Sequence, residues 1–249
     1  MPNTRISIEL VPRDAATLQG ELHLVREAFA SVNTINLPDL PRFPVRSWEG
    51  CALAKPFFAH TIPHIRAIDI PVDQPLAMVE SLRHSAIREI LVVTGDAHPD
   101  RPPPDNASTV LQAIRRFKTE LPDILVYAAL DPYRQGFRQE YDYLQQKLAA
   151  GADGFFTQPF FDLRLMEIYA ELLAETPVFW GVSPVTTGAS RAYWERQNHL
   201  LFPRHFEPTL DWNRDFARQA LAFARNSQTH IYFMPIRIDV VHYLEGILS

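Results

Sequence analysis

Residues 89–96, Glu-Ile-Leu-Val-Val-Thr-Gly-Asp, decide the fold class of this chain. The middle of the run is apolar at successive positions rather than at alternate ones. That pattern is typical of a parallel strand covered on both faces. A polar residue, Asp96, follows where such a strand ends. The stretch therefore predicts an α/β protein in which helices flank a parallel sheet.

Segments of this kind recur along the chain and alternate with stretches of helical spacing. Strands are predicted at residues 6–11, 34–37, 61–69, 89–96, 124–130, 154–160, 178–184 and 231–237. Helices are predicted at residues 15–32, 76–84, 107–121, 139–150, 163–175, 191–199, 213–225 and 239–248. Asn106 and Asp162 are the expected N-caps of two helices, and Gly151 is an expected C-cap.

Eight predicted strands with helices between them are the count of a (β/α)8 TIM barrel, which we expect to be a single domain over residues 1–249. The alternative is an open doubly wound sheet. Such a sheet usually carries a glycine-rich phosphate-binding turn, but the 9 glycines form no G-x-G-x-x-G or G-x-x-x-x-G-K motif. The pattern favours the barrel.

Composition excludes several classes of protein. The 24 Lys and Arg against 29 Asp and Glu give a net charge of −5, which argues against a general nucleic-acid binder. The lone Cys51 rules out an internal disulfide framework and is expected to be a small buried hydrophobe. No apolar stretch is long enough to span a membrane, and Glu9 interrupts the first apolar run. We expect a cytoplasmic protein without membrane partners.

Polar residues stand where the predicted strands end, the positions that carry catalytic groups in a barrel. They are Glu9, Asn36, Asp39, His64, Asp69, Asp96, Tyr127, Asp131, Gln158, Ser183 and Arg237. Two carboxylates, an amide and an arginine would converge on one pocket. That set suits a polar heterocycle with a carboxylate tail.

Each of these residues also has a structural interpretation. Glu9 could form a salt bridge with Arg237, Asp96 could cap a helix, and the Gln158 amide could bond to neighbouring backbone. A single His64 is more often a packed core histidine than a ligand. A metal site would draw on His64, Asp69, Asp96 and His98. No metal-binding spacing supports that site, and no G-x-S-x-G motif supports a serine nucleophile.

Four motifs, followed by a late strand that ends in Arg, resemble the methylenetetrahydrofolate reductase family. The motifs are Ile-Glu-Leu-Val-Pro at 8–12, Ile-Pro-His-Ile-Arg-Ala-Ile-Asp at 62–69, Val-Val-Thr-Gly-Asp at 92–96 and Ala-Gly-Ala-Asp-Gly-Phe-Phe-Thr-Gln-Pro-Phe-Phe-Asp at 150–162. The last of them is the most specific. The resemblance runs from Ile6 to about Tyr243 and implies a (β/α)8 barrel.

The resemblance implies reduction of 5,10-methylenetetrahydrofolate to 5-methyltetrahydrofolate, with FAD as hydride carrier and NADH or NADPH as donor. By this resemblance, Glu9 is the general acid and Asp96 a carboxylate near flavin and pterin. Gln158 contacts the folate, and Arg237 holds its glutamate tail. The positions that match flavin contacts are His64, Val93, Thr94, Gly95, Asp96, Tyr127 and Lys147. No metal is implied, and a homo-oligomer is expected.

The flavin half of the site departs from the family pattern more than the folate half. Thr94 stands where the family usually has Arg, and among the FAD-holding positions near 143–147 only Lys147 keeps its type. Fewer positive contacts predict weaker binding of the anionic FAD diphosphate. The alternatives are a folate reductase without tightly bound flavin, one that needs a partner subunit, a folate-binding accessory protein of methyl transfer, or an unrelated barrel lyase or aldolase.

Overall fold

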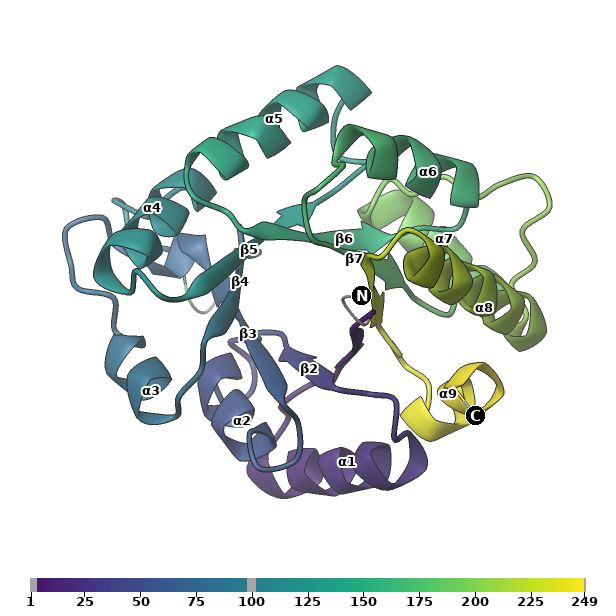
Figure 1. The fold of residues 1–249 in the computed structure, drawn as a ribbon, viewed down its shortest axis with the longest axis horizontal. Helices are drawn as coiled ribbons and strands as arrows, with labels where there is room; N and C mark the ends of the chain where they lie inside the picture. Colours follow the sequence, from purple (N-terminus) through teal and green to yellow (C-terminus); the bar gives the residue numbers. More distant parts are fainter. Residues whose placement is uncertain (1–3, 98–101, 249) are drawn as a thin grey trace.

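The structure, a computed structural model that describes residues 4–97 and 102–248, is a closed barrel of eight parallel strands surrounded by helices (Figure 1). The strands are β1 Ile6–Glu9, β2 Thr34–Leu37, β3 His60–Arg66, β4 Glu89–Val93, β5 Leu125–Leu130, β6 Gly154–Pro159, β7 Val178–Val182 and β8 His230–Phe233. The helices are α1 Ala15–Ala28, α2 Ser47–Ala54, α3 Val79–His84, α4 Val110–Glu120, α5 Phe137–Ala149, α6 Leu163–Leu172, α7 Gly188–Gln197, α8 Leu210–Asn226 and α9 Val240–Leu248. The predicted (β/α)8 barrel is confirmed, and the open sheet is wrong.

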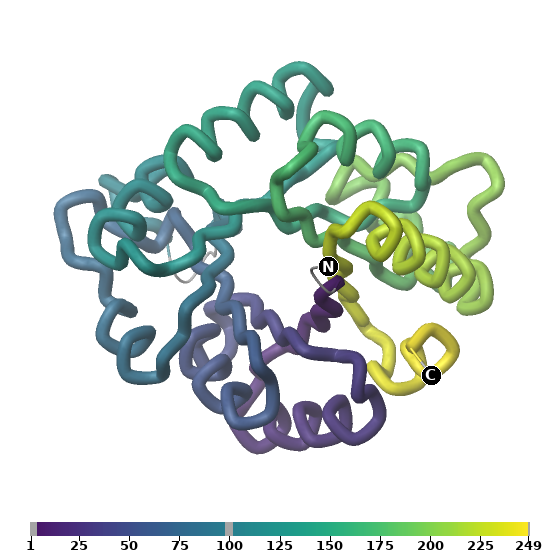
Figure 2. The backbone as a smooth tube through the Cα atoms, viewed as in Figure 1, coloured from purple at the N-terminus to yellow at the C-terminus, as the bar shows by residue number. Residues whose placement is uncertain are grey.

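Closure of the barrel depends on pairing between the first and last strands. Ile6 and Ile8 of β1 lie opposite Ile231 and Phe233 of β8, and Figure 2 shows the purple start of the chain beside the yellow segment that leads into the last helix. Because closure leaves no free sheet edge, β1 has a neighbour on each side. Glu9, the last residue of β1, is therefore surrounded by side chains from several strands.

Along β4, side chains alternate between two apolar environments. In β4, Ile90 and Val92 pack in the main core between barrel and helices. Leu91 and Val93 belong to a second cluster inside the barrel. This alternation between two buried faces explains why residues 89–96 are apolar at successive positions.

The barrel interior is aromatic on one side and polar on the other. Phe156 and Phe179 stack with ring centroids 4.1 Å apart, and Tyr127 and Tyr232 pack edge-on against Phe156. Strands β1 to β3 and the residue before β1 instead contribute polar side chains: Arg5, Ser7, Glu9, Thr34, Asn36 and His64. Buried polar groups must be paired, so hydrogen bonds rather than packing alone organise this side.

Helix ends confirm the predicted N-cap Asp162, move the C-cap of α5 from Gly151 to the preceding Ala150, and correct the third prediction. The Asp162 carboxylate accepts from the Arg164 amide at 3.0 Å to begin α6, and Gly151 follows α5 at φ +108°. However, α4 begins only at Val110 with Thr109 as its N-cap. Asn106 instead donates to Asp73 at 2.6 Å, so that N-cap prediction is wrong.

Two elements differ from the sequence prediction in ways that affect the site. β8 ends at Phe233 rather than at 237, because Pro235 has no N–H to continue the ladder. Arg237 therefore lies in a loop, at φ +58°. Helix α2 was not predicted, since it is only 8 residues long and has no clear apolar stripe. As predicted, Cys51 is buried in it.

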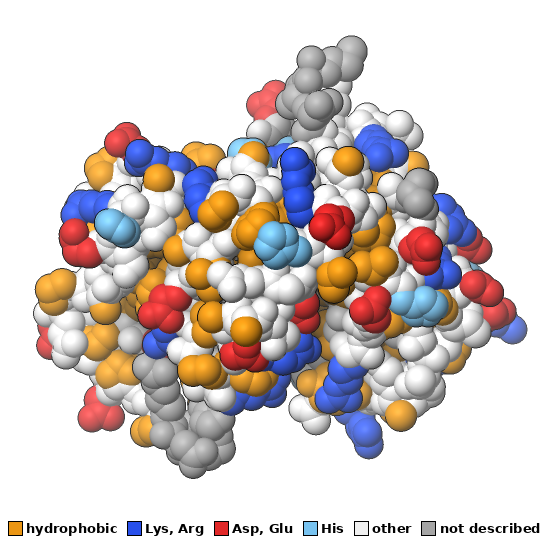
Figure 3. Space-filling model, turned by 90° about the horizontal axis from the view of Figure 1, so that it is seen from below, with side chains coloured by type: hydrophobic (Ala, Val, Ile, Leu, Met, Phe, Trp, Pro, Cys, Tyr) orange, Lys and Arg blue, Asp and Glu red, His pale blue; other side chains and the backbone are white. Residues whose placement is uncertain are grey.

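On the side of the molecule that Figure 3 shows, charged side chains of both signs are mixed rather than gathered into one patch. On that side, where α1 lies, acidic and basic side chains are interspersed with hydrophobic ones. Of the helices in the described part of the chain, none is long and apolar enough to cross a membrane.

Candidate active site

Strands β1, β2, β3 and β8 bring together a buried group of side chains, called here the acid cluster: Ser7, Glu9, Asn36, His64 and Tyr232. The Tyr232 hydroxyl donates a hydrogen bond to Oε2 of Glu9. Nε2 of His64 lies 4.0 Å from the same oxygen and 3.0 Å from Nδ2 of Asn36. The other end of the Asn36 amide, Oδ1, accepts from Ser7 at 3.1 Å.

Burial sets the protonation of this cluster. It raises the pKa of Glu9 from 4.5 to about 7, although the Tyr232 hydrogen bond acts in the opposite direction. Burial also lowers the pKa of His64 to about 3, against the weaker effect of the Asp39 charge. At neutral pH the histidine is uncharged while the carboxyl is partly protonated. The cluster can therefore supply a proton near neutral pH, as a general acid must.

A second set of residues lines a cavity of about 180 Å³ above the ends of β4, β5 and β6, called here the β4–β6 pocket. Its lining includes six of the residues that the family resemblance assigns to the site, Val93, Thr94, Gly95, Asp96, Lys147 and Gln158, and also the strand-end residue Asp131. The Asp96 side chain is exposed, and its backbone carbonyl accepts from Arg66 at 2.6 Å. Within the described residues no hydrogen bond engages the Gln158 amide, which leaves it able to bind a ligand.

The backbone of the turn after β4 requires glycine at position 95. Its φ is +86°, a conformation that favours glycine. A Cβ there would lie 3.0 Å from Cβ of Arg66. The turn after β4 therefore requires glycine whether or not a ligand approaches it.

Lys147 of α5 is buried at the edge of the β4–β6 pocket. Its Nζ donates to the Ala129 carbonyl at 2.6 Å and lies 4.0 Å from Glu140 and 4.1 Å from the Tyr143 ring centroid. Burial lowers the pKa of Lys147 to about 8, although Glu140 acts against it. The lysine is thus still a cation at neutral pH, with its charge already balanced by the protein.

The residues of this pocket do not fit the diphosphate of FAD. Its charged lining holds more carboxylates than cations: Asp96, Asp131 and Glu140 against Arg134 and Lys147. Both cations have partners, since Arg134 lies 3.6 Å from Asp131 and Nζ of Lys147 lies 4.0 Å from Glu140. A strongly anionic group placed here would meet repulsion and little compensation.

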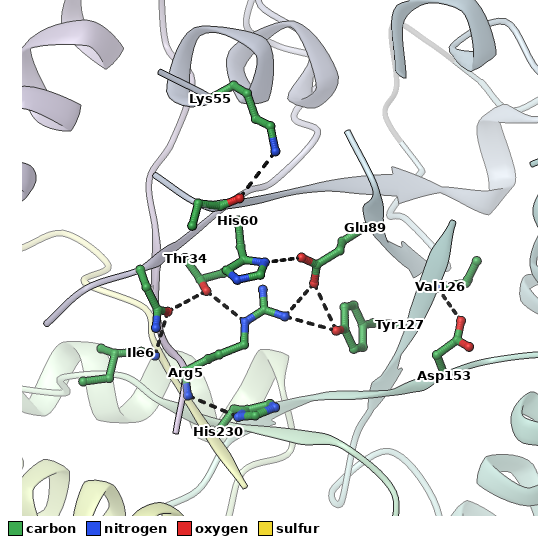
Figure 4. A network of polar contacts seen from close by, with 12 residues as sticks. Arg5, Ile6, Thr34, Lys55, His60, Glu89, Val126, Tyr127, Asp153 and His230 are labelled. Carbon is green, nitrogen blue, oxygen red and sulfur yellow. Dashed lines mark hydrogen bonds and ion pairs between the residues drawn. The ribbon is translucent and has the colours of Figure 1, made fainter. Parts of the chain in front are cut away.

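Two predicted site residues lie apart from both groups. The Tyr127 hydroxyl donates to Glu89 at 3.0 Å, in a polar network at the N-terminal end of the barrel that also includes Arg5 (Figure 4). Arg237 is exposed, with its guanidinium 5.6 Å from the Tyr193 ring centroid. Across the described ranges, no ion pair joins Arg237 to Glu9.

The alternative metal site is not assembled by the residues that can be placed. Asp69 pairs with Arg66 at 2.9 Å and lies 3.8 Å from Arg46. His98 lies outside the described residues. Among those that are described, no three His, Cys, Asp or Glu side chains are grouped so as to hold a metal ion.

Sequence reasoning did not select Tyr232, the hydrogen-bond partner of Glu9. Tyr232 lies opposite Ser7 in the β1–β8 pairing. The available signal was a hydroxyl-bearing residue inside an otherwise apolar run, on the strand that closes the barrel next to β1. Without knowledge of the register, that residue could equally have faced the helices.

Comparisons with known proteins agree with the fold and with the motifs. A family model described as methylenetetrahydrofolate reductase matches residues 50–229. Methylenetetrahydrofolate reductase 2 of Saccharomyces cerevisiae (strain ATCC 204508 / S288c) is 25% identical over 173 residues, 62% of this chain. The match covers only 28% of the yeast protein's length.

Solved structures with similar folds share little sequence with this chain. An uncharacterized protein from Clostridium thermocellum that binds two copies of 5-methyl-5,6,7,8-tetrahydrofolic acid has a TM-score of 0.63 at 11% identity, with 99% of this chain and 93% of that chain covered. A 2,3-dimethylmalate lyase has a TM-score of 0.60 at 12% identity, with 95% and 76% covered. These likenesses show the fold, whereas the family model matches most of the sequence: the chain belongs to the methylenetetrahydrofolate reductase family.

Proposed function

We propose that this protein reduces 5,10-methylenetetrahydrofolate to 5-methyltetrahydrofolate with electrons from NADH or NADPH. The observation that carries the proposal is the position of Glu9 in the acid cluster: its carboxyl is 14% exposed, accepts from Tyr232 and lies beside an uncharged His64. The loss of solvent there raises the pKa of Glu9 to about 7, which leaves it partly protonated at neutral pH. The family match begins at residue 50 and so does not include Glu9. Support for its role comes from the geometry of the acid cluster and from the short motif around it.

The reaction needs such an acid. The bridging carbon of the substrate accepts hydride only after its five-membered ring opens to a cationic iminium. Glu9 would donate a proton to a ring nitrogen and so drive that opening. Hydride then adds to the iminium carbon and forms the methyl group, and Glu9 regains its proton from solvent.

Other residues have roles that their surroundings support. The Asp96 carboxylate, exposed above β4, would stabilise the cationic iminium. The Gln158 amide offers both a donor and an acceptor to the heterocycle. Arg237, exposed and without a carboxylate partner in the described chain, would bind the glutamate tail with two parallel hydrogen bonds.

The source of the hydride follows from the charge of the β4–β6 pocket. FAD is the carrier that the family resemblance implies, but the carboxylates of this pocket oppose its diphosphate. NADH and NADPH carry the same diphosphate, which must lie outside this pocket for them as well. We favour direct transfer because of the charge that develops at the nicotinamide ring, with Lys147, Val93 and Thr94 shaping the pocket around that ring. Oxidation of the donor creates a cationic nicotinamide ring, and nearby Asp96 and Asp131 would stabilise it.

A second candidate is folate binding without reduction. The barrel from Clostridium thermocellum binds 5-methyltetrahydrofolic acid, so this fold serves as a folate site in a protein whose activity its description does not give. An accessory protein of methyl transfer would bind the folate through Gln158 and Arg237 but would oxidise no NAD(P)H. Residues 1–249 as one domain, a homo-oligomeric assembly and a cytoplasmic location stay predictions.

The decisive experiment follows the hydrogen itself. The purified protein is checked for flavin absorption, then mixed with methylenetetrahydrofolate and dihydronicotinamide deuterated at C4. Direct transfer keeps the deuterium in the product methyl group, whereas a flavin exchanges it with solvent. Folate binding without any NAD(P)H oxidation, by the native protein with either donor, would contradict the reductase proposal and favour the accessory protein.

A further inference from the structure

The hydrogen bonds around Glu9 have a direction. The Oδ1 atom of Asn36 accepts from Ser7 at 3.1 Å, so the amide turns its Nδ2 toward His64. One Nδ2 hydrogen reaches Nε2 of His64 at 3.0 Å. Nδ2 is a donor only, so Nε2 of His64 is the acceptor and does not carry the ring proton.

A hydroxyl group has one proton to donate. Because Nε2 of His64 carries no proton to donate, Oε2 of Glu9 receives its hydrogen from the Tyr232 hydroxyl. That oxygen is thereby occupied as an acceptor, and in the protonated carboxyl the acidic hydrogen belongs on the other oxygen. The cluster thus distinguishes two atoms that are chemically equivalent in a free carboxyl group.

We propose that Tyr232 is a positioning residue for Glu9: its hydroxyl holds Oε2 and leaves the transferable proton on Oε1. This inference rests on the proposed function for its catalytic meaning. The placement of the proton itself rests only on the contacts within the acid cluster.

The groups that face Glu9 make Tyr232 its dominant partner. His64 from β3 is uncharged and 4.0 Å away. Asp39, beyond β2, is held by Arg46 at 2.5 Å. On the side toward α1 and α9, a shallow pocket beside Glu9 includes Arg13, Glu21 and Asp239, and Arg13 is paired with Glu21 at 3.0 Å. In the part of the chain that is described, no cation touches the Glu9 carboxylate.

This arrangement predicts how Glu9 responds when the hydroxyl is removed. The Tyr232 hydrogen bond favours the carboxylate form, so its loss leaves burial unopposed and the acid weaker. A hydrogen bond to an ionised carboxylate corresponds to a pKa change of about one pH unit or somewhat more. In Tyr232→Phe the pKa of Glu9 should therefore rise by about that amount.

The experiment measures the titration of Glu9 in the ligand-free protein by carboxyl ¹³C NMR and assigns the resonance with Glu9→Gln. Three proteins are compared: native, Tyr232→Phe and Tyr127→Phe. Tyr127 is a matched control, because its hydroxyl also lies inside the barrel and also donates to a glutamate, Glu89. The pH dependence of turnover is then recorded for the same three proteins.

We expect Tyr232→Phe to move both the resonance and the high-pH limb of kcat upward by about one pH unit, while the KM for folate stays within about twofold. Tyr127→Phe should move neither. If Tyr232→Phe folds poorly, Tyr232→Met provides a second variant, because it also removes the hydroxyl donor, keeps an apolar side chain inside the barrel and should shift the titration in the same direction.

Unchanged titration of Glu9 in Tyr232→Phe, or an equal shift in the Tyr127 control, would overturn the inference. The two proposals fail separately. If Glu9 titrates as described but the native protein oxidises no NAD(P)H with folate, the positioning of the proton stands and the proposed reaction falls.

Discussion

Two glutamates in the interior of the same barrel have pKa values that are shifted in opposite directions. Glu9, at the C-terminal end of β1, has its pKa raised to about 7. Glu89, at the start of β4, has its pKa lowered to about 2. Burial alone would raise the pKa of both carboxyls. What differs is the set of neighbours.

At the N-terminal end of the barrel, Glu89 accepts hydrogen bonds from Arg5 at 2.7 Å, His60 at 2.6 Å and Tyr127 at 3.0 Å (Figure 4). The His60 bond and the Arg5 charge outweigh burial there. At the other end of the barrel, the neighbours of the Glu9 carboxyl are the Tyr232 hydroxyl and the uncharged His64. The comparison teaches that neighbouring groups hold Glu89 as an anion at one end of the barrel and leave Glu9 partly protonated at the other.

The largest effect should be on turnover. Glu9→Gln removes the acid while keeping the shape, and we expect kcat to fall by roughly 10²–10⁴-fold. Folate binding should survive, as measured by calorimetry. The matched Glu89→Gln change, also in the barrel interior, should lower kcat by less than about threefold in the folded protein. Equal losses in both variants would break the comparison, because Glu9 would then have no special part in the chemistry.

The next effect is on stability. Glu89→Gln leaves the Arg5 guanidinium, which is also 5.0 Å from the Phe179 ring centroid, buried without its anion. Breaking a buried pair in this way costs about 3–5 kcal/mol of unfolding free energy. Urea unfolding at pH 7 measures it. Glu80→Gln, which removes an exposed pair with Arg83, is the control and should cost less than about 1 kcal/mol.

The two carboxyls should also give opposite pH dependences of stability. The pKa of Glu89 is lower in the folded state, so its stabilisation is present above pH 4.5 and is lost as the pH falls toward 2. The pKa of Glu9 is higher in the folded state, so its contribution is present below pH 4.5 and is lost as the pH rises through 7.

Glu9→Gln should therefore stabilise the protein at pH 8 by up to about 3 kcal/mol and change little at pH 4. Urea unfolding at the two pH values checks the sign. A destabilised variant at pH 8 would mean that Glu9 is held as a favourable anion, like Glu89, and the contrast between the two ends would disappear.

The smallest effect is expected for Arg237, in the loop after β8. Arg237 contacts the Tyr193 ring and has no carboxylate partner among the placed residues, so its removal should be tolerated structurally. Arg237→Ala should raise the KM for folate by about tenfold, the equivalent of about 1.4 kcal/mol, and leave the KM for NAD(P)H unchanged. Steady-state kinetics with each substrate varied decide it, and equal changes in both KM values would assign Arg237 a structural role.

The sequence by itself determined the architecture. Eight short strand-forming segments that alternate with helical ones, several of them apolar at successive positions, have few ways to pair other than as a parallel sheet covered by helices. The pattern of Asp162 and Gly151 at helix ends was also readable, because capping depends on local backbone chemistry. So was the presence of Glu9 near the end of a strand, since its place in the chain is local information.

Only the tertiary structure decided what these residues do. Glu9 and Tyr232 are 223 positions apart in the chain and meet because β8 closes on β1. Tyr127 was expected at the flavin site, but its long side chain reaches the opposite end of the barrel to Glu89. Strand register and side-chain direction set these contacts, and a pKa depends on the charges that such contacts bring together. Two glutamates with the same side chain therefore differ in pKa because of their neighbours.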